Sequence, residues 1–342
     1  MAMEKTIATM GEFELIGRFF APLEKVGTSG LPLLTGIGDD AAVLSVPRTQ
    51  NLLTSMDTLV EGIHFSTGQD PFLVGCKALL VNISDMAAMG AVPHWYFLSL
   101  SLPGSTPVTW VEAFARGLQE TAENYSLSLA GGDTVGSQAG ITITITILGL
   151  VGQNRAILRS GAREGDRVYV SGTIGDATLG LAWSRGHLPW IDAADGSWLQ
   201  NRLDLPLPRV DLGKMLQDAA VAHAAIDISD GLVADLGHIG MRSGVQVHIH
   251  AEKIPLSDSA RRAIHGREID LMPRLLTGGE DYELAFVAPV GAHHSILEIS
   301  HRLAIPITEI GVCVAGEPGV TLLHQGVPVS LERGGWSHFQ PA

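Results

Sequence analysis

Residues 141–147 alternate strictly between isoleucine and threonine, beginning and ending with isoleucine. Successive side chains of an extended chain point to opposite sides, so this segment has one apolar face and one hydroxyl face. The alternation predicts a β-strand whose isoleucines pack against a hydrophobic core. Further strands are expected where short apolar runs lie between turn residues, at 52–56, 95–102, 127–130 and 167–171.

Helical segments are expected between these strands. Pro71 follows Asp70 and opens an apolar stretch that runs to Ala88, and proline suits the first position of a helix. The segment Thr109–Glu112 has the form of a capping box and predicts a second helix start. A third helix is expected to begin at Asp230, with Leu232, Leu236 and Ile239 on its apolar face. Strands that alternate with helices predict a mixed α/β (α+β) fold.

The chain has 342 residues, and domains of about 150 residues are typical, so two domains are expected. A boundary fits near residue 150, where the Ile/Thr segment has ended and the polar turn 152–155 begins. The predicted domains are therefore 1–150 and 151–342. The apolar fraction of 46% is sufficient for a large core and excludes general disorder.

The charge of the chain limits its partners. A net charge of −14 argues against a nucleic-acid groove, which needs a basic surface. The first fifteen residues carry acids rather than the apolar region of a signal peptide, and prolines interrupt the charge-free stretch 86–111. Two cysteines cannot form a disulfide framework. A cytoplasmic protein without a membrane span is expected.

The acids of interest stand at the ends of apolar runs, where α/β proteins build their sites. They are Asp39, Asp40, Asp57, Asp85, Asp133, Asp227 and Asp230. Two interpretations remain open at this point. Each aspartate can be a turn former or helix cap, as Asp230 before Gly231 illustrates. Together they can hold Mg²⁺, which prefers oxygen ligands and usually binds along with substrate phosphates.

Familiar phosphate-binding loops are absent from the sequence. No GxxxxGK[ST] motif occurs, and no GxGxxG motif follows a predicted strand. Basic residues near the acidic motifs are few, chiefly Lys77 and Arg159. A polyphosphate bound here would need metal ions for most of the neutralising charge.

The motifs, taken in order, resemble those of thiamine-monophosphate kinases, within the aminoimidazole-ribonucleotide synthetase-like superfamily. The resemblance extends from Gly11 to Phe339. It rests on GIGDDAAV (36–43), SMDTLVEGIHF (55–65), KALLVNISDMAAMGAVP (77–93), AGGDT (130–134), LRSGAREGD (158–166), DISDGLVADLGHI (227–239) and GGEDYEL (278–284).

The resemblance implies a kinase that uses ATP and several Mg²⁺ ions to convert thiamine monophosphate into thiamine diphosphate. It implies a two-domain synthetase-like fold. The N-terminal domain would bind ATP and Mg²⁺ and would pair into a homodimer across a β-barrel, and the C-terminal domain would be α/β. The alternative activity is that of another ATP-using synthetase of the superfamily. A non-enzymatic ion-binding module would leave Arg159 and Trp336 without a role.

Matching positions carry the family's functional residues onto this chain. The implied metal ligands are Asp40, Ser55, Met56, Asp57, Asp85, Asp133, Asp227 and Asp230. The implied ATP contacts are Gly132, Asp133, Arg159 and Ser229. The implied contacts with thiamine phosphate are His64, Glu280 and Trp336. Asp57, Asp85, Asp133 and Arg159 are the residues expected to act in catalysis.

Several of these residues also have structural interpretations. Met56 stands where the family often has threonine, and a thioether is a poor Mg²⁺ ligand, so a contact there would use its main-chain carbonyl. His64 can be a turn or core residue, and Glu280 can end the glycine turn before it. Trp336 can cover the edge of the core, although an aromatic ring also suits a cationic, aromatic substrate.

Overall fold

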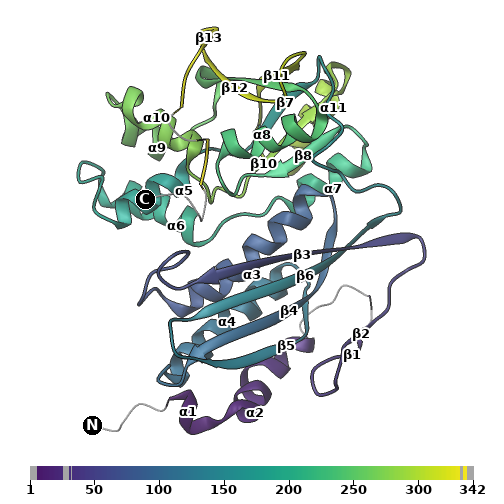
Figure 1. Cartoon of the computed structure of the whole chain (residues 1–342), viewed down its shortest axis with the longest axis vertical. Helices are drawn as coiled ribbons and strands as arrows, with labels where there is room; N and C mark the ends of the chain where they lie inside the picture. The colour runs from purple at the N-terminus through teal and green to yellow at the C-terminus, as the bar shows by residue number, and fades with distance from the viewer. Residues whose placement is uncertain (1–5, 26–30, 32, 332–333, 337–342) are drawn as a thin grey trace. The chain divides into compact units, whose positions relative to one another are not determined.

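The structure is a computed structural model that describes residues 6–25, 31, 33–331 and 334–336. The chain divides into two compact units, which are described separately (Figure 1). Unit 1 consists of Met1–Met86 and Ala91–Asn154. Unit 2 consists of Ala87–Gly90 and Arg155–Ala342.

Unit 1 contains a four-stranded sheet in the order β3-β6-β4-β5, together with the small hairpin β1-β2. Strands β4 and β5 are parallel, and the other neighbours in the larger sheet are antiparallel. Its strands and helices are α1 (Ile7–Met10), α2 (Glu12–Leu15), η1 (Ile16–Phe20), η2 (Ala21–Lys25), β1 (Leu33–Thr35), β2 (Val43–Leu44), β3 (Gln50–Val60), α3 (Pro71–Ala88), β4 (Val92–Pro103), α4 (Val108–Asn124), β5 (Ser128–Ser137) and β6 (Thr142–Gly152).

The two faces of this sheet differ. The isoleucines of the Ile/Thr segment are almost fully buried, at 6% exposure or less, on the face that α3 and α4 cover (Figure 1). The other face carries hydroxyl and exposed apolar side chains, among them Met56 and Val135. The alternation in the sequence therefore predicted both the strand and the direction of its side chains.

Helices α3 and α4 approach so closely that each needs a glycine at the contact. A Cβ on Gly75 would lie 2.2 Å from the carbonyl oxygen of Phe114, and one on Gly117 would lie 2.1 Å from that of Phe72. Among the described helices, α3 is the one long and apolar enough to span a membrane, but 78% of the residues in that stretch are buried inside the protein. Its apolar character therefore fits a core helix.

Unit 2 contains a seven-stranded sheet in the order β13-β12-β9-β11-β7-β10-β8, in which β12 and β9 are parallel and the other neighbours are antiparallel. Its elements are β7 (Arg167–Ser171), α5 (Asp176–Ser184), α6 (Ala193–Asp204), α7 (Val210–Asp218), β8 (Ala224–Asp227), α8 (Leu232–Ser243), β9 (Gln246–His250), η3 (Ala251–Lys253), α9 (Asp258–Ile264), α10 (Glu268–Thr277), β10 (Leu284–Ala288), η4 (Val290–Ala292), α11 (His293–Leu303), β11 (Ile307–Val314), β12 (Gly319–His324) and β13 (Val327–Pro328).

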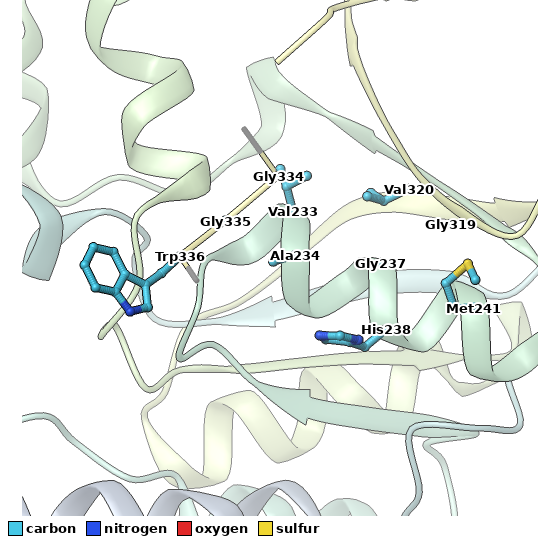
Figure 2. Close-up of a pocket in the computed structure, with 10 residues that line it drawn as sticks. All are labelled: Val233, Ala234, Gly237, His238, Met241, Gly319, Val320, Gly334, Gly335 and Trp336. Carbon is cyan, nitrogen blue, oxygen red and sulfur yellow. The ribbon is translucent and has the colours of Figure 1, made fainter. Parts of the chain in front are cut away.

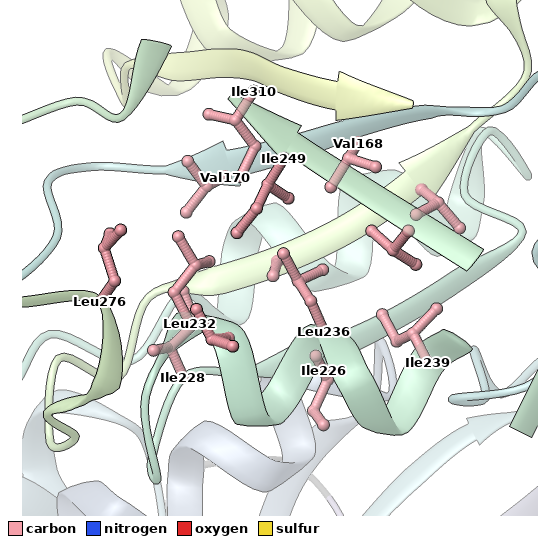
Figure 3. Close-up of a cluster of buried hydrophobic side chains, with 14 of the residues drawn as sticks. Val168, Val170, Ile226, Ile228, Leu232, Leu236, Ile239, Ile249, Leu276 and Ile310 are labelled. Carbon is pink, nitrogen blue, oxygen red and sulfur yellow. The ribbon is translucent and has the colours of Figure 1, made fainter. Parts of the chain in front are cut away.

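Both faces of this sheet are covered around β7, β8 and β10. Val168 and Val170 point to one face, where they join Leu232, Leu236 and Ile239 of α8 in one buried cluster (Figure 3). Tyr169, which lies between the two valines, points to the other face and packs in a second cluster with side chains of α7 and α11. Burial on both sides explains why β7, β8 and β10 are almost continuously apolar, whereas β9 alternates between buried and half-buried residues.

The mixed α/β fold and its principal elements are as predicted, with differences at the helix starts. The capping-box prediction is wrong, because α4 begins at Val108 with Pro107 as its N-cap and Thr109 already lies inside it. Helix α8 begins after Gly231 rather than at Asp230. In the described part of the chain no sheet closes into a barrel, since the sheet orders are open in both units.

Candidate functional site

The predicted ligands of unit 1 that the structure brings together lie between β3 and α3. Ser55 Oγ donates a hydrogen bond to Asp85 Oδ2 at 2.5 Å, and the main-chain N–H of Asp57 donates to Asn82 Oδ1 at 3.1 Å. Ser55 and Asp57 are two residues apart on a strand and share a face, while Asn82 and Asp85 are three apart on a helix and do the same. The result is a half-buried group of hard oxygen donors.

Met56 lies on the opposite face of β3 from Ser55 and Asp57. Its side chain is 63% exposed, and the two-residue period of a strand directs it away from α3. The thioether of Met56 is therefore not part of the oxygen group.

Asp133 also lies on the face that α3 does not cover. In the sheet it pairs with Ser99, which pairs with Thr144, and Thr144 Oγ1 lies 2.8 Å from Thr58 Oγ1. Neighbouring partners in a sheet share a face, so Asp133 shares its face with Thr58 and not with Asp57. Gly132 is held tightly against β4, because a Cβ there would lie 1.9 Å from the carbonyl oxygen of Leu98.

The remaining predicted residues of unit 1 lie in turns. Asp40 is exposed, and its N–H donates to Asp39 Oδ1 at 2.9 Å. His64 Nδ1 accepts a hydrogen bond from the Val60 N–H at 3.0 Å. That nitrogen must carry no proton while the bond exists, so the ring acts in part as the turn former that the sequence also allowed.

In unit 2 the segment after β8 forms a clamped turn. Asp227, which is buried, ends the strand opposite Leu284, and Ser229, Asp230 and Gly231 follow. The N–H groups of the last three all donate to Asp235 Oδ2, each at 3.1 Å. Asp235 lies in the first turn of α8, and its carboxylate reaches back to N–H groups that precede the helix.

The segment 278–282 lies directly against this turn. The Glu280 N–H donates to the Ser229 carbonyl oxygen at 2.9 Å, and a Cβ on Gly279 would lie 1.9 Å from that same oxygen. Glu280 and Tyr282 have φ angles of 69° and 50°, in the left-handed region that such residues rarely adopt. The glycine thus allows the close approach, and the strained backbone sets the position of Glu280.

Asp281 attaches the segment 278–282 to the start of α5. Its carboxyl oxygens accept hydrogen bonds from the N–H groups of Gly175, at 2.7 Å, and Ala177, at 3.2 Å, at the start of α5. Burial raises the pKa of Asp281 to about 8, with the Asp176 carboxyl adding to the effect, although these N–H groups favour the charged form.

Trp336 also attaches to the clamped turn. Its N–H donates to the Asp230 carbonyl oxygen at 2.9 Å, and its side chain is 59% exposed. Figure 2 shows the ring at one end of an open groove of about 460 Å³ that follows α8 toward Met241. The groove is lined by Val233, Ala234, Gly237, His238, Met241, Gly319, Val320, Gly334, Gly335 and Trp336.

Arg159 lies in an exposed loop by the other end of α8. Its carbonyl oxygen accepts a hydrogen bond from Ser243 Oγ at 3.3 Å, and Ser243 is the last residue of the helix. The clamped turn precedes the first residue of the same helix. The main chain of Arg159 is therefore separated from Asp230 by the length of α8, about 18 Å at 1.5 Å per residue.

The donor set suits Mg²⁺ better than a softer metal. Among the described residues, no group of three or more His, Cys, Asp or Glu side chains is arranged to hold a metal ion. Mg²⁺ keeps several waters and commonly binds through one or two carboxylates together with substrate phosphates. Small groups of hydroxyl and carboxylate oxygens, such as Ser55 with Asp85, fit that mode of binding.

Comparison with known proteins places the chain in a family. Residues 38–151 match the family described as AIR synthase related protein, N-terminal domain. Over 329 residues the chain is 41% identical to the thiamine-monophosphate kinase of Escherichia coli strain K12, an alignment that covers 96% of this chain and 98% of that protein. The chain belongs to the thiamine-monophosphate kinase family.

Solved structures of thiamine-monophosphate kinases share this fold. The crystal structure of the enzyme from Stenotrophomonas maltophilia K279a has a TM-score of 0.80 and 40% identity, and covers 94% of this chain and 98% of that one. AaThiL complexed with AMPPCP and TMP has a TM-score of 0.74 and 35% identity, and covers 99% of this chain and 100% of that one.

Three side chains at the candidate site were not singled out from the sequence. Asn82 contacts Asp57, Asp235 clamps the turn of Ser229 and Asp230, and Asp281 holds the segment of Glu280. Asn82 had a detectable signal, since it lies three residues before Asp85 on a predicted helix. Asp235 and Asp281 had none, because their partners come from main-chain groups that only the folded turn presents.

The raised pKa of Asp281 predicts a pH-dependent stability. The unfolded chain loses the Asp281 proton near pH 4, and the native state keeps it to about pH 8, so this group's contribution to stability falls as the pH rises between these values. Asp281→Asn removes that contribution. The Tm of the wild type should fall more from pH 5 to pH 8.5 than the Tm of the variant, as measured by calorimetry.

Asp195→Asn provides the control for this experiment. The Arg262 guanidinium lowers the pKa of Asp195 to about 2, so its removal should leave the slope between pH 5 and pH 8.5 unchanged. Parallel Tm curves for the wild type and Asp281→Asn would show that Asp281 is charged in the native state.

Proposed function

We propose that this chain catalyses the ATP-dependent phosphorylation of thiamine monophosphate to thiamine diphosphate, by direct in-line transfer that requires Mg²⁺. The observation that carries the proposal is 41% identity to a named thiamine-monophosphate kinase over 96% of this chain. AaThiL complexed with AMPPCP and TMP, similar along the whole chain, supports the same pair of substrates. The alternative, another ATP-using synthetase, lacks such support.

The residues proposed to act keep the roles given by their motifs. In unit 1 the proposed metal ligands are Asp40, Ser55, Met56 (through its carbonyl), Asp57, Asp85 and Asp133. In unit 2 they are Asp227 and Asp230. Gly132, Asp133, Arg159 and Ser229 are assigned to ATP, and His64, Glu280 and Trp336 to thiamine monophosphate. The assignment of Ser55 and Asp85 is supported by their 2.5 Å contact.

Phosphoryl transfer to a phosphate group requires the protein to position the two substrates and does not require a catalytic base. The accepting group is a phosphate monoester, whose second pKa near 6 leaves it largely ionised at pH 7. His64 Nδ1 is already engaged by the Val60 N–H, which supports a positioning role for this side chain. Bound Mg²⁺ would supply the positive charge that brings two anionic phosphates together. Arg159 would add a fixed cation that can bind phosphate through two N–H groups.

The proposed enzyme is a cytoplasmic homodimer. Domain 1–150 would bind ATP and Mg²⁺ and form a homodimer, in which the open faces of two unit 1 sheets build a β-barrel. Exposed apolar side chains on that face, including Leu52, Met56 and Val135, support the pairing. Domain 151–342 would supply the α/β half of the enzyme, and the location would be cytoplasmic.

The activity is tested by incubating the purified chain with ATP, Mg²⁺ and thiamine monophosphate and measuring thiamine diphosphate by chromatography. Product should form, EDTA should stop its formation, and excess Mg²⁺ should restore it, because the residues assigned to metal are hard oxygen donors. Absence of product with Mg²⁺ and also with Mn²⁺ would contradict the proposal.

Replacing Trp336 by alanine should weaken the binding of thiamine monophosphate. Loss of a ring stacked on a cation costs about 0.5–2 kcal/mol, so the KM for thiamine monophosphate should rise from about twofold to about thirtyfold while the KM for ATP stays constant. Trp198→Ala is the control, since Trp198 is 43% exposed but lies on α6. An equal rise in both KM values would mean that Trp336 supports the fold instead.

The proposed homodimer can be tested by measuring the mass of the protein in solution. Light scattering should give a mass close to twice 36.2 kDa for the wild type. Val135→Glu should shift the protein toward the monomer, because it buries a charge in the paired face. Val290→Glu, at an exposed valine of unit 2, should leave the mass unchanged. A monomeric wild type would exclude the barrel.

A further inference from the structure

A single carboxyl oxygen holds the turn that carries two proposed site residues. Asp235 Oδ2 accepts hydrogen bonds from the N–H groups of Ser229, Asp230 and Gly231, all at 3.1 Å. Asp235 is 2% exposed, so bulk water does not compete with it as the acceptor in the native protein. The bond from Gly231 is buried and those from Ser229 and Asp230 are partly buried, so loss of the acceptor would destabilise this turn.

The turn cannot hold its shape through helical hydrogen bonds. It precedes the first residue of α8, where main-chain N–H groups have no partner within the helix. Gly231 has a φ of 121°, and a Cβ there would lie 2.9 Å from the carbonyl carbon of Thr277. The conformation is therefore imposed by the contact with Thr277 on one side and by Asp235 on the other.

Three of the proposed substrate-binding segments depend on this turn. Ser229 and Asp230 belong to it, the Glu280 N–H donates to the Ser229 carbonyl oxygen, and the Trp336 N–H donates to the Asp230 carbonyl oxygen, both at 2.9 Å. A rotation of the peptide planes at Ser229 or Asp230 would move the attached segments as well. The residues assigned to ATP and to thiamine monophosphate in unit 2 thus share one support.

We infer that Asp235 is a positioning residue that holds Ser229 and Asp230, and through them Glu280 and Trp336, in the geometry that binds both substrates. The inference rests on the proposed function for the identity of those substrates. It differs from a simple helix-capping role, because a cap stabilises α8 without affecting two separate ligand contacts.

The test compares Asp235→Ala, Asp235→Asn and Asp195→Ala. Asparagine keeps a carbonyl oxygen that can accept the three N–H bonds, whereas alanine removes the acceptor. Asp195 is a matched control, since it is also buried in the first turn of a helix, α6, but accepts from Ser259 and Arg262. Three readouts are needed: amide hydrogen exchange of the peptide that contains 229–231, Tm, and calorimetric binding of AMPPCP with Mg²⁺ and, separately, of thiamine monophosphate.

In Asp235→Ala the exchange of residues 229–231 should accelerate, and the Kd values for AMPPCP and for thiamine monophosphate should both rise at least about tenfold, which corresponds to about 1.4 kcal/mol each. Asp235→Asn should recover most of both affinities. Asp195→Ala should lower Tm but leave the exchange and both Kd values unchanged. This joint loss differs from the effect of Trp336→Ala, which should weaken thiamine monophosphate alone.

The outcomes separate this inference from the proposed function. Unchanged Kd values in Asp235→Ala, or equal losses in the two alanine variants, would overturn the positioning role while leaving the kinase activity standing. A wild type that binds both compounds but forms no thiamine diphosphate would overturn the proposed function and leave the positioning role intact. A wild type that binds neither compound would overturn both.

Discussion

Three main-chain hydrogen bonds between residues 228–229 and 280–283 organise unit 2 around its candidate site. They join Ile228 to Tyr282 and to Glu283, and Ser229 to Glu280, each at 2.9 Å. The bonds continue the antiparallel ladder of β8 and β10 beyond the pair Asp227–Leu284. Two sequence motifs about fifty residues apart therefore act as one element. The approach is possible because Gly279 has no side chain to collide with Ser229.

Two arginines that contact this element, Arg202 and Arg209, stabilise the fold. Arg202 and Arg209 both bond to Glu283, which is fully buried, at 3.1 and 2.5 Å. A buried charge requires such partners, so these cations are committed to neutralising Glu283. The N–H groups of Ser229, Asp230 and Gly231, which precede α8, are likewise bonded to Asp235. A net charge of −14, together with these engaged donors, is consistent with the proposed role of Mg²⁺ in phosphate binding.

Much of the fold follows from local patterns. The Ile/Thr alternation predicted β6 and its buried face, and Pro71 marked the first residue of α3. The start of α4 was misplaced because a capping box is a local signal, and Pro107, with φ −62° and ψ 142°, provides a competing N-cap two residues before Thr109. Of the acids expected at strand ends, Asp227 does end β8, but Asp57 and Asp133 lie inside β3 and β5, and Asp85 lies inside α3. The sequence predicted neither of the carboxyls, Asp235 and Asp281, that hold the loops in place.

What the sequence by itself determined is the identity of the motifs and the direction of each side chain along its own element, because both depend on neighbours within a few residues. The tertiary structure decided which of those side chains meet. It brought Ser55 to Asp85, and it placed Asp57 and Asp133 on opposite faces of one sheet. The reason is register: a two-residue period orients a side chain within its strand, but only the pairing of strands and the packing of helices sets its position against residues far away in the chain.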